Sequence, residues 1–137
     1  MLLKKTYSVT GSDSSKIFVD RYKKDHRGAD TILLDAVTIK TEAKYDCLYS
    51  NKVLHHLKKN DLKKSFRRQK TVLNDGGILF HSFWYGDKEE EHHGLLFVYY
   101  LEGQIIDMVK DDYEILGKEK YTEMAADDSF YIVLKVH

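Results

Sequence analysis

Short apolar runs alternate with amphipathic stretches along the first half of the chain, and this alternation predicts strands and helices in turn. Strands are expected over residues 7–10, 31–34 and 47–49, each running into small or polar residues. Helices are expected over 16–24 and 61–73, where apolar residues recur at helical spacing. Strands separated by helices are typical of an α/β fold with a parallel sheet.

The second half of the chain continues the pattern with further strands. Its apolar stretches predict a strand over 78–85, an ambiguous segment over 95–100, a short helix over 105–109, and strands over 113–121 and 130–136. Residues 86–94 are mostly charged and are expected to form a loop. The last two strands are joined by an acidic turn at Asp127 and Asp128, so an antiparallel closing hairpin is expected.

Signals for helix ends accompany both long helices. Ser14 or Ser15 can cap the first, because a serine oxygen can accept from an otherwise unpaired backbone N–H. Asn60 is the corresponding candidate for the second helix. The segment Asn74–Gly77 is expected to end that helix, since glycine adopts the left-handed conformation easily.

Composition places the chain among folded globular proteins. Its 137 residues suit one domain over 1–137, and 42% hydrophobic with 32% charged residues excludes a disordered chain. No apolar run reaches the roughly 20 residues of a membrane span, and the first five residues contain no apolar signal-peptide stretch. A single cysteine, Cys47, cannot form an internal disulfide, so a reducing, cytoplasmic location is expected.

The formal net charge is zero, but the charges are unevenly distributed. Residues 1–70 carry 17 Lys or Arg and 8 Asp or Glu, whereas residues 71–137 carry 5 and 14, so the halves have net charges of +9 and −9. This pattern indicates either solvated faces that neutralise each other or association of two copies, and a homodimer is expected. The basic stretch 58–70 raises a phosphate-binding alternative, but the zero net charge does not favour nucleic acid as a partner.

Four segments carry a resemblance to a known family. Tyr45–Leu57, with the letters YDCLYSNKVLHHL, is the strongest of them, and Val9–Ser15, Leu33–Ala36 and Val72–Leu79 are the others. Read in order, they resemble class I S-adenosylmethionine-dependent methyltransferases of the small-molecule type, with 45–57 similar to the fourth strand and the entry to the next helix. The resemblance implies a Rossmann-like sheet, mostly parallel with an antiparallel last strand.

The start of the chain departs from the family pattern. The family normally begins with a strand that runs into a glycine-rich loop of GxGxG type, but only ten residues precede Gly11 and none of them is glycine. The resemblance therefore implies a shortened domain without the first strand, which in the family lies in the middle of the sheet. Its two neighbours are expected to pair directly, to present open edges, or to be complemented by a second chain.

The resemblance also implies S-adenosylmethionine as the cofactor, bound beyond the carboxyl ends of the strands. By this comparison Asp13 accepts from the ribose hydroxyls and Asp35 from the adenine amino group, although either acid also suits a structural place beside a turn or helix N-terminus. The full set of expected cofactor contacts is Asp13, Ser14, Asp35, Ala36, Ser50 and Asn51. Asp46 begins its strand, at the opposite edge of the sheet, and is expected to be structural.

Methyl transfer from a sulfonium rests on positioning and desolvation, so no catalytic residue is assigned. The expected substrate contacts are His55, His56, Trp84, Tyr85 and Tyr99, with packing in the core as the alternative for each. The chain has no proline and so lacks the Asn/Asp-Pro-Pro-aromatic motif of methyltransferases that act on DNA bases or glutamine amides. Its histidines have no zinc-ligand spacing, and no metal is expected.

Together these features favour an S-adenosylmethionine-dependent methyltransferase that acts on a small molecule. The alternative is a non-catalytic relic that keeps the fold as an interaction or oligomerisation module, because the glycine-rich cofactor loop is absent. A third hypothesis, anion or nucleic-acid binding by the basic helix, would be separated from both by salt-dependent retention on nucleic acid.

Overall fold

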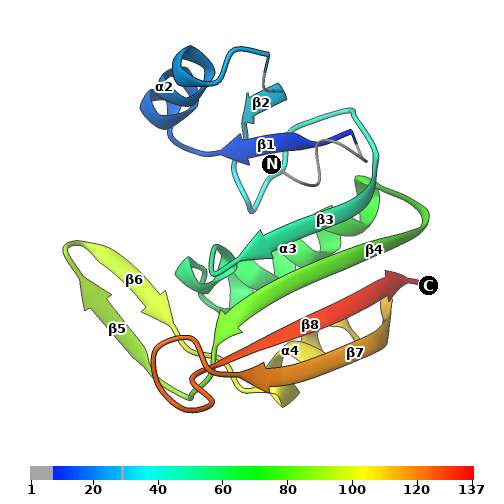
Figure 1. Ribbon diagram of the computed structural model, residues 1–137. Coiled ribbons are helices and arrows are strands. Elements are labelled where there is room, and N and C mark those ends of the chain that lie inside the picture. Colours follow the sequence, from blue (N-terminus) through cyan, green and yellow to red (C-terminus); the bar gives the residue numbers. More distant parts are fainter. Residues whose placement is uncertain (1–7, 29) are drawn as a thin grey trace. The chain divides into compact units, whose positions relative to one another are not determined.

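The computed structural model describes residues 8–28 and 30–137 (Figure 1). The chain forms two compact units, Met1–Thr41 and Glu42–His137, and each is described by itself. The first unit contains strands β1 and β2 and helix α2, and the second contains strands β3–β8, helices α3 and α4 and the short 3-10 helix η1.

A two-stranded parallel sheet forms the centre of the first unit. Strand β1 (Thr10–Asp13) pairs with β2 (Asp30–Leu33), and Asp13 lies opposite Leu33 at their common carboxyl end. The strand predicted over 7–10 was placed too early, because residues 11–13 pair along β2 instead of forming a loop. Tyr7, its predicted first residue, lies outside the described residues.

Helix α2 (Lys16–Asp25) connects the two strands of this unit. The Ser15 hydroxyl accepts from the Phe18 N–H at 3.2 Å, so Ser15 and not Ser14 caps the helix. Within this helix Val19 is buried, whereas Phe18 is 51% exposed. The predicted helix and its serine cap are both confirmed.

The second unit is built on a four-stranded sheet with the order β3-β4-β8-β7 (Figure 1). Its strands are β3 (Tyr45–Asn51), β4 (Leu73–Trp84), β7 (Tyr113–Tyr121) and β8 (Ser129–Val136). The pair β3/β4 is parallel, and β8 is antiparallel to both β4 and β7. The expected α/β class is confirmed, with parallel strands followed by an antiparallel final pair.

One face of the four-stranded sheet is covered by helices α3 (Lys59–Thr71) and α4 (Glu102–Val109) (Figure 1). Side chains at alternate positions of the strands meet the apolar stripes of these helices in a buried core. The fully buried members include Leu62, Phe66, Leu79, Phe83, Ile105, Phe130, Ile132 and Leu134. Tyr113 extends the core, and its hydroxyl donates to the Phe66 carbonyl at 2.6 Å, which fixes α3 to β7.

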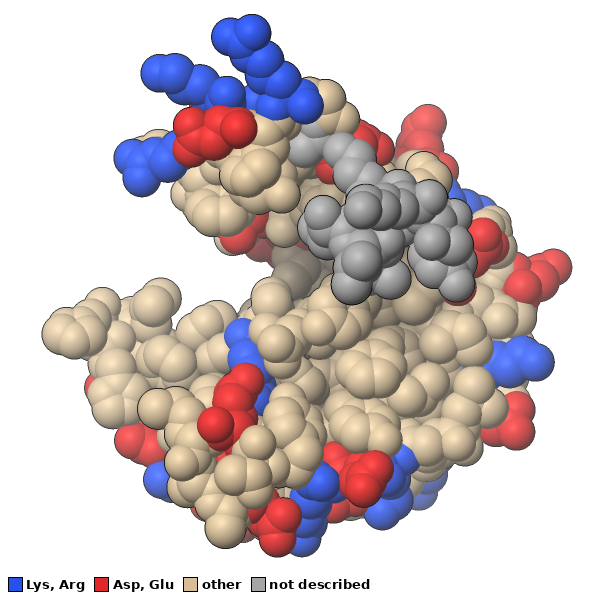
Figure 2. Space-filling model, viewed as in Figure 1, with Lys and Arg blue, Asp and Glu red and all other residues tan. Residues whose placement is uncertain are grey.

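The opposite face of this sheet, here called the open face, is covered by no helix within residues 42–137. The rings of Tyr49, Phe80 and Tyr131 lie side by side across β3, β4 and β8, with centroids 5.6 Å and 5.2 Å apart. Tyr49 is 62% exposed. Uncharged side chains spread over this region, with charged groups around its rim (Figure 2).

The second long helix begins and ends two residues before its predicted bounds. Helix α3 starts at Lys59, so Asn60 lies within its first turn instead of capping it, and Lys58 provides no side-chain cap. The segment 74–77 lies near the start of strand β4, in an irregularity between the pairs Tyr45/Leu73 and Cys47/Ile78, and Gly76 adopts the expected left-handed conformation, with φ +70°. Asn74 Nδ2 donates to Asp46 Oδ1 at 2.8 Å, so Asp46 holds the start of β3 against this segment.

The charged stretch 86–94 was wrongly predicted to be a loop throughout. Residues Glu89–His92 form strand β5, which pairs antiparallel with β6 (Leu95–Val98). His93 and Gly94 connect the strands with φ +52° and +80°, the left-handed conformations that favour a tight hairpin. Charged side chains are compatible with this hairpin because most of them point into solvent.

Candidate cofactor and substrate site

Asp13 and Ser14 lie at the carboxyl end of β1, where the sequence placed a cofactor contact. Asp13 Oδ1 accepts from the Ser15 N–H at 2.8 Å, and the Asp13 carbonyl accepts from the Leu34 N–H at 2.8 Å. Asp13 Oδ2 has no hydrogen bond to the described residues, and the side chain is half-buried. The carboxylate therefore supports the turn into α2 with one oxygen, and the other has no hydrogen bond to the described residues.

Asp35 and Ala36 follow β2 at the same carboxyl edge. Asp35 Oδ1 accepts from the Thr38 and Val37 N–H groups at 3.0 and 2.8 Å. The hydrogen bond from the Thr38 N–H, and after it the one from Val37, lowers the pKa of the Asp35 carboxyl below its ordinary value. The acid is therefore held ionised on the turn that follows β2.

Ser50 is engaged inside the second unit, on the helix-covered face of the sheet. Its Oγ lies 2.6 Å from His81 Nδ1, and His81 Nε2 lies 2.7 Å from Gln69 Oε1. Gln69 Nε2 then donates to Ser65 Oγ at 2.9 Å, so the chain of contacts runs from β3 through β4 into α3. Because an amide oxygen only accepts, His81 donates through Nε2 and accepts the Ser50 proton at Nδ1. Burial lowers the pKa of His81 to about 3 and keeps the ring neutral.

Asn51 and the residue after it lie at the carboxyl end of β3. Asn51 Oδ1 accepts from the Ser82 hydroxyl, and Ser82 Oγ also accepts from the Lys52 N–H at 3.1 Å. Asn51 as a whole is exposed at the strand end. Lys52 adopts a left-handed conformation with φ +56°, which turns the chain away from the sheet.

Lys52 anchors Trp84, a predicted substrate contact, on the open face. Lys52 Nζ lies 3.8 Å from the centroid of the Trp84 ring and 5.1 Å from that of Tyr121. The same ammonium group donates to Glu123 Oε2 and Ser129 Oγ, both at 2.8 Å. Its side chain is only 9% exposed, so the lysine ties the β3 end to the β7–β8 turn. Sequence reasoning missed this role for Lys52.

The adjacent histidines of η1 (Leu54–His56) occupy different environments. His56 Nδ1 lies 2.7 Å from the Leu96 carbonyl, whereas His55 is 3% exposed and neither of its ring nitrogens has a partner in hydrogen-bond geometry. Both rings pack on Phe97, with centroids 5.1 Å away. Burial is the main cause that lowers the pKa of His55 to about 4, and the neighbouring His56 and Lys52 add to the shift. The Lys52 backbone opposes it weakly. His55 is therefore neutral at physiological pH.

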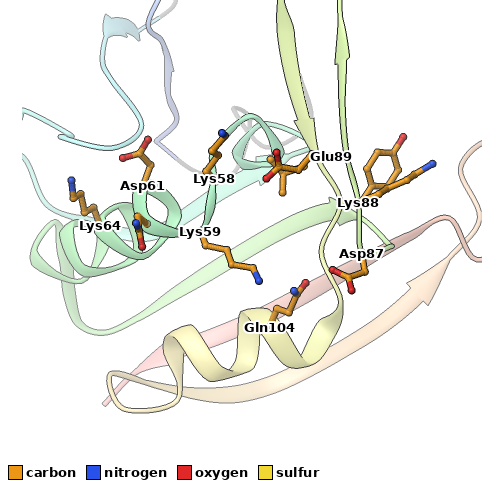
Figure 3. Close-up of a pocket in the computed structure, with 11 residues that line it drawn as sticks. Lys58, Lys59, Asp61, Lys64, Asp87, Lys88, Glu89 and Gln104 are labelled. Carbon is orange, nitrogen blue, oxygen red and sulfur yellow. The ribbon is translucent and has the colours of Figure 1, made fainter.

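A cavity of about 830 Å³ lies between the start of α3, the segment after β4 and helix α4 (Figure 3). Lysines surround it, and Lys58, Lys59, Lys64 and Lys88 line it together with Asp61, Asp87, Glu89, Tyr99 and Gln104. Of the five predicted substrate contacts, Tyr99 alone lines this cavity, and Lys88 Nζ lies 4.5 Å from its ring centroid. Tyr85 is covered elsewhere by Lys120, whose Nζ is 4.0 Å from the ring centroid.

The contacts around Ser50 were not predicted, although the sequence contains one signal for them. Gln69 falls at helical spacing with Leu62 and Phe66 on the buried face of α3. A polar side chain on such a face needs a partner, because a buried amide without hydrogen bonds is costly. His81, at an inward position of β4, is that partner.

Two features are absent from residues 8–28 and 30–137. No group of three or more His, Cys, Asp or Glu side chains is arranged to hold a metal ion within these ranges. No helix in the same ranges is long and apolar enough to cross a membrane.

Comparison with known proteins agrees with this geometry. A family model described as a methyltransferase domain matches residues 1–81, more than half of the chain. No curated protein matches the sequence significantly. Among solved structures, S-adenosylmethionine-dependent methyltransferases from Methanosarcina mazei and Clostridium acetobutylicum have TM-scores of 0.80 and 0.77, each at 13% identity. Both alignments cover 98% of this chain. They cover 84% of the Methanosarcina protein and 77% of the Clostridium protein.

A third similar structure is the 1,6-didemethyltoxoflavin-N1-methyltransferase of Burkholderia thailandensis, with a TM-score of 0.78 and 14% identity over 98% of this chain and 63% of that one. Identities this low show a shared fold. Together with the family match, they place the chain in the methyltransferase domain family. Its fold is that of the class I S-adenosylmethionine-dependent methyltransferases.

Proposed function

We propose that this chain binds S-adenosylmethionine and takes part in methyl transfer to a small-molecule acceptor. The observation that carries the proposal is the carboxyl edge of the β1/β2 pair. There the Leu34 N–H donates to the Asp13 carbonyl, which brings the chain segments of two acids to the same edge. Asp13 keeps one carboxylate oxygen for a ligand and Asp35 is held ionised.

The side chains of this edge suit the ribose and adenine ends of the cofactor. Asp13 Oδ2 can accept from a vicinal diol, since a carboxylate oxygen is a strong acceptor for hydroxyl donors. Asp35 can accept from an exocyclic amino group, although its Oδ1 already serves two backbone N–H groups. The Ser50 hydroxyl donates to His81, so it could take part in a cofactor contact only as an acceptor. The exposed amide of Asn51 is the remaining candidate on β3.

When bound, the cofactor supplies a methyl group on a sulfonium, and the protein has to orient the acceptor and exclude water. Within the second unit, neutral His55 packs on aromatic Phe97 and stays a predicted substrate contact. Support for a small-molecule acceptor comes from the related structures. The Burkholderia enzyme is bound to 1,6-didemethyltoxoflavin and S-adenosylhomocysteine, and MtfA is a glycopeptide N-methyltransferase. A cytoplasmic location belongs to the same proposal, since Cys47 is a free, exposed thiol.

Isothermal titration calorimetry with S-adenosylmethionine and S-adenosylhomocysteine tests the proposal. Asp13→Asn is the informative variant, because the asparagine oxygen can still accept from the Ser15 N–H while the charge is lost. Loss of hydrogen bonds to a charged group costs roughly 1.5–3 kcal/mol, which weakens binding about ten- to hundredfold. Asp25→Asn, at the exposed end of α2, is the matched control and should bind as the unmodified chain does.

Two results would contradict this proposal. Absence of binding heat for the unmodified chain at millimolar cofactor would favour the non-catalytic alternative, an interaction module that has lost the cofactor. Equal weakening by Asp13→Asn and Asp25→Asn would show that the carboxylate of Asp13 has no particular role. Formation of S-adenosylhomocysteine from S-adenosylmethionine in the presence of a panel of small amines and hydroxyl compounds then tests transfer itself.

A further inference from the structure

The cavity of Figure 3 is formed by residues of the second unit alone. Its walls are the start of α3, the segment that follows β4 and the start of α4, and its volume is about 830 Å³. Pockets for small ligands typically have volumes of roughly 300–1,000 Å³ and a few polar groups placed to fix the orientation of the ligand. The size of the cavity therefore suits a small molecule.

Opposite charges face each other across this cavity. The α3 wall carries Lys58 and Lys59, and the wall that follows β4 carries Asp87 and Glu89. In Figure 3 the side chains of Lys59 and Asp87 point into the same part of the cavity. Neither of these two side chains has an ion-pair partner among the described residues, whereas Lys88 beside them is paired with Glu90 at 2.9 Å. One free cation and one free anion are thus directed into the cavity from different elements.

Gln104, on α4, adds a hydrogen-bond donor at the same place (Figure 3). Its Oε1 accepts from the Leu101 N–H at 2.8 Å, which fixes the side chain at the start of the helix. The Nε2 group is therefore the end of the side chain that remains to donate. An ammonium group and an amide N–H together suit a carboxylate, and the Asp87 carboxylate suits an ammonium group.

We propose that this cavity binds a small zwitterion, an α-amino acid, with its carboxylate at Lys59 and Gln104 and its ammonium group at Asp87. Charges on both ends of the ligand then match the walls they face, which fixes its orientation as well as its affinity. A ligand with one charge alone would leave either Lys59 or Asp87 without a counterion. Tyr99 also lines the cavity and offers aromatic surface to the side chain of the ligand. The role of this amino acid as a methyl acceptor rests on the proposed function, but its binding does not.

Nuclear magnetic resonance titration of the full chain with L-phenylalanine, without S-adenosylmethionine, tests the site. Binding at millimolar concentration should shift backbone amide signals within 58–64, 87–89 and 98–104, and not those within 113–121. L-Phenylalaninamide, which lacks the carboxylate, and N-acetyl-L-phenylalanine, which lacks the ammonium group, should each bind about fivefold more weakly, because each loses one contact between charges at the protein surface.

Two substitutions assign each charge of the ligand to its wall. Lys59→Met should reduce the affinity for L-phenylalanine to that for the amide and should not weaken binding of the amide itself. Asp87→Asn should reduce it to that for the N-acetyl compound and should not weaken binding of that compound. Lys63→Met on α3 and Glu91→Gln on β5 change the same charges at exposed positions outside the cavity, and both should bind as the unmodified chain does. Far-UV circular dichroism establishes that all four variants are folded.

Three results would overturn the proposal. The first is an L-phenylalanine titration that shifts no signals, or shifts them only within 113–121. The second is equal binding of all three compounds. The third is a loss of affinity that is the same for Lys59→Met and Lys63→Met, or for Asp87→Asn and Glu91→Gln. Because the titrations contain no cofactor, a chain that fails to bind S-adenosylmethionine can still bind the amino acid, so the two proposals fail separately.

Discussion

The hydroxyl of Ser50 lies 2.6 Å from Nδ1 of His81, across the parallel pair β3/β4. Because Gln69 binds the other ring nitrogen, both nitrogens of a fully buried imidazole are occupied by neutral partners. The arrangement satisfies the uncharged ring completely and leaves no place for a second proton. This relationship makes the second unit sensitive to acid.

Stability should fall as the pH drops from neutrality toward 4. The pKa of His81 is lowered to about 3 and that of His55 to about 4, against an ordinary value of 6.5 for both. Below 6.5 the unfolded chain therefore binds protons that the folded chain does not, and the free energy of unfolding decreases until the folded values are reached. Urea titrations at pH 7 and pH 5 measure the change. His81→Asn should reduce this pH dependence, whereas His92→Gln, on the exposed hairpin, should retain it.

Neighbouring acids of the β7–β8 turn should respond differently to substitution. The Asp128 carboxylate accepts from the N–H groups of Glu123, Met124 and Ala125, which hold its pKa well below the ordinary range. Asp128→Asn removes the charge and one acceptor oxygen, so the urea midpoint should decrease. Asp127 has φ +50°, a conformation that glycine adopts without strain. Asp127→Gly should leave the midpoint unchanged or raise it, and an equal loss in both variants would contradict the assignment.

Removing the cation over Trp84 should loosen the β7–β8 turn. Lys52→Met keeps the aliphatic stem but leaves Glu123 and Ser129 without their shared donor. The expected loss in the free energy of unfolding is about 1–3 kcal/mol, accompanied by a change in the fluorescence of Trp84, the one tryptophan of the chain. Lys16→Met is the control, since its ion pair with Asp20 is exposed and screened by solvent and should contribute little to stability. Similar losses in the two variants would argue against a specific role for Lys52.

Helix α2 should depend on Ser15 and not on Ser14. Ser15→Ala removes the oxygen that accepts from Phe18, and loss of such a cap costs about 1 kcal/mol. Amide exchange across 16–25 in the full chain should accelerate about fivefold, which corresponds to that free energy. Ser14→Ala should exchange at the unmodified rate. Equal acceleration in the two variants would mean that the helix start is not fixed by a single serine.

The sequence predicted best where local chemistry determines the structure. Helix α2 with its serine cap, strands β7 and β8 and the acidic turn between them follow from spacing, capping and turn residues close together in the chain. The hairpin at 89–98 was missed because its charged strand looks like a loop until the pairing of Glu89 with Val98 is known. Cross-strand pairing is a long-range property, and strand preference depends on it more than helix preference does.

The candidate site was predicted only in part, because some of its contacts also depend on long-range pairing. Asp13 and Asp35 could be placed near strand ends, because small and polar residues follow each apolar run, although β1 extends three residues beyond its predicted end. The commitment of Ser50 to His81, and the placement of Lys52 over Trp84, depend on side chains about 30 residues apart meeting in the fold. Periodicity places each of them on a face but does not identify the partner.

The order of strands in the second unit has a consequence for how the chain folds during synthesis. Strand β8 lies between β4 and β7, so it supplies a pairing partner to both, yet it comes after every other strand of the unit in the chain. Until the ribosome has released residues 129–136, β4 has one free side and β7 has no partner in the sheet. The nascent unit therefore remains open at its centre while it is being made. Its sheet closes in a late step, and association with chaperones is most useful just before that step.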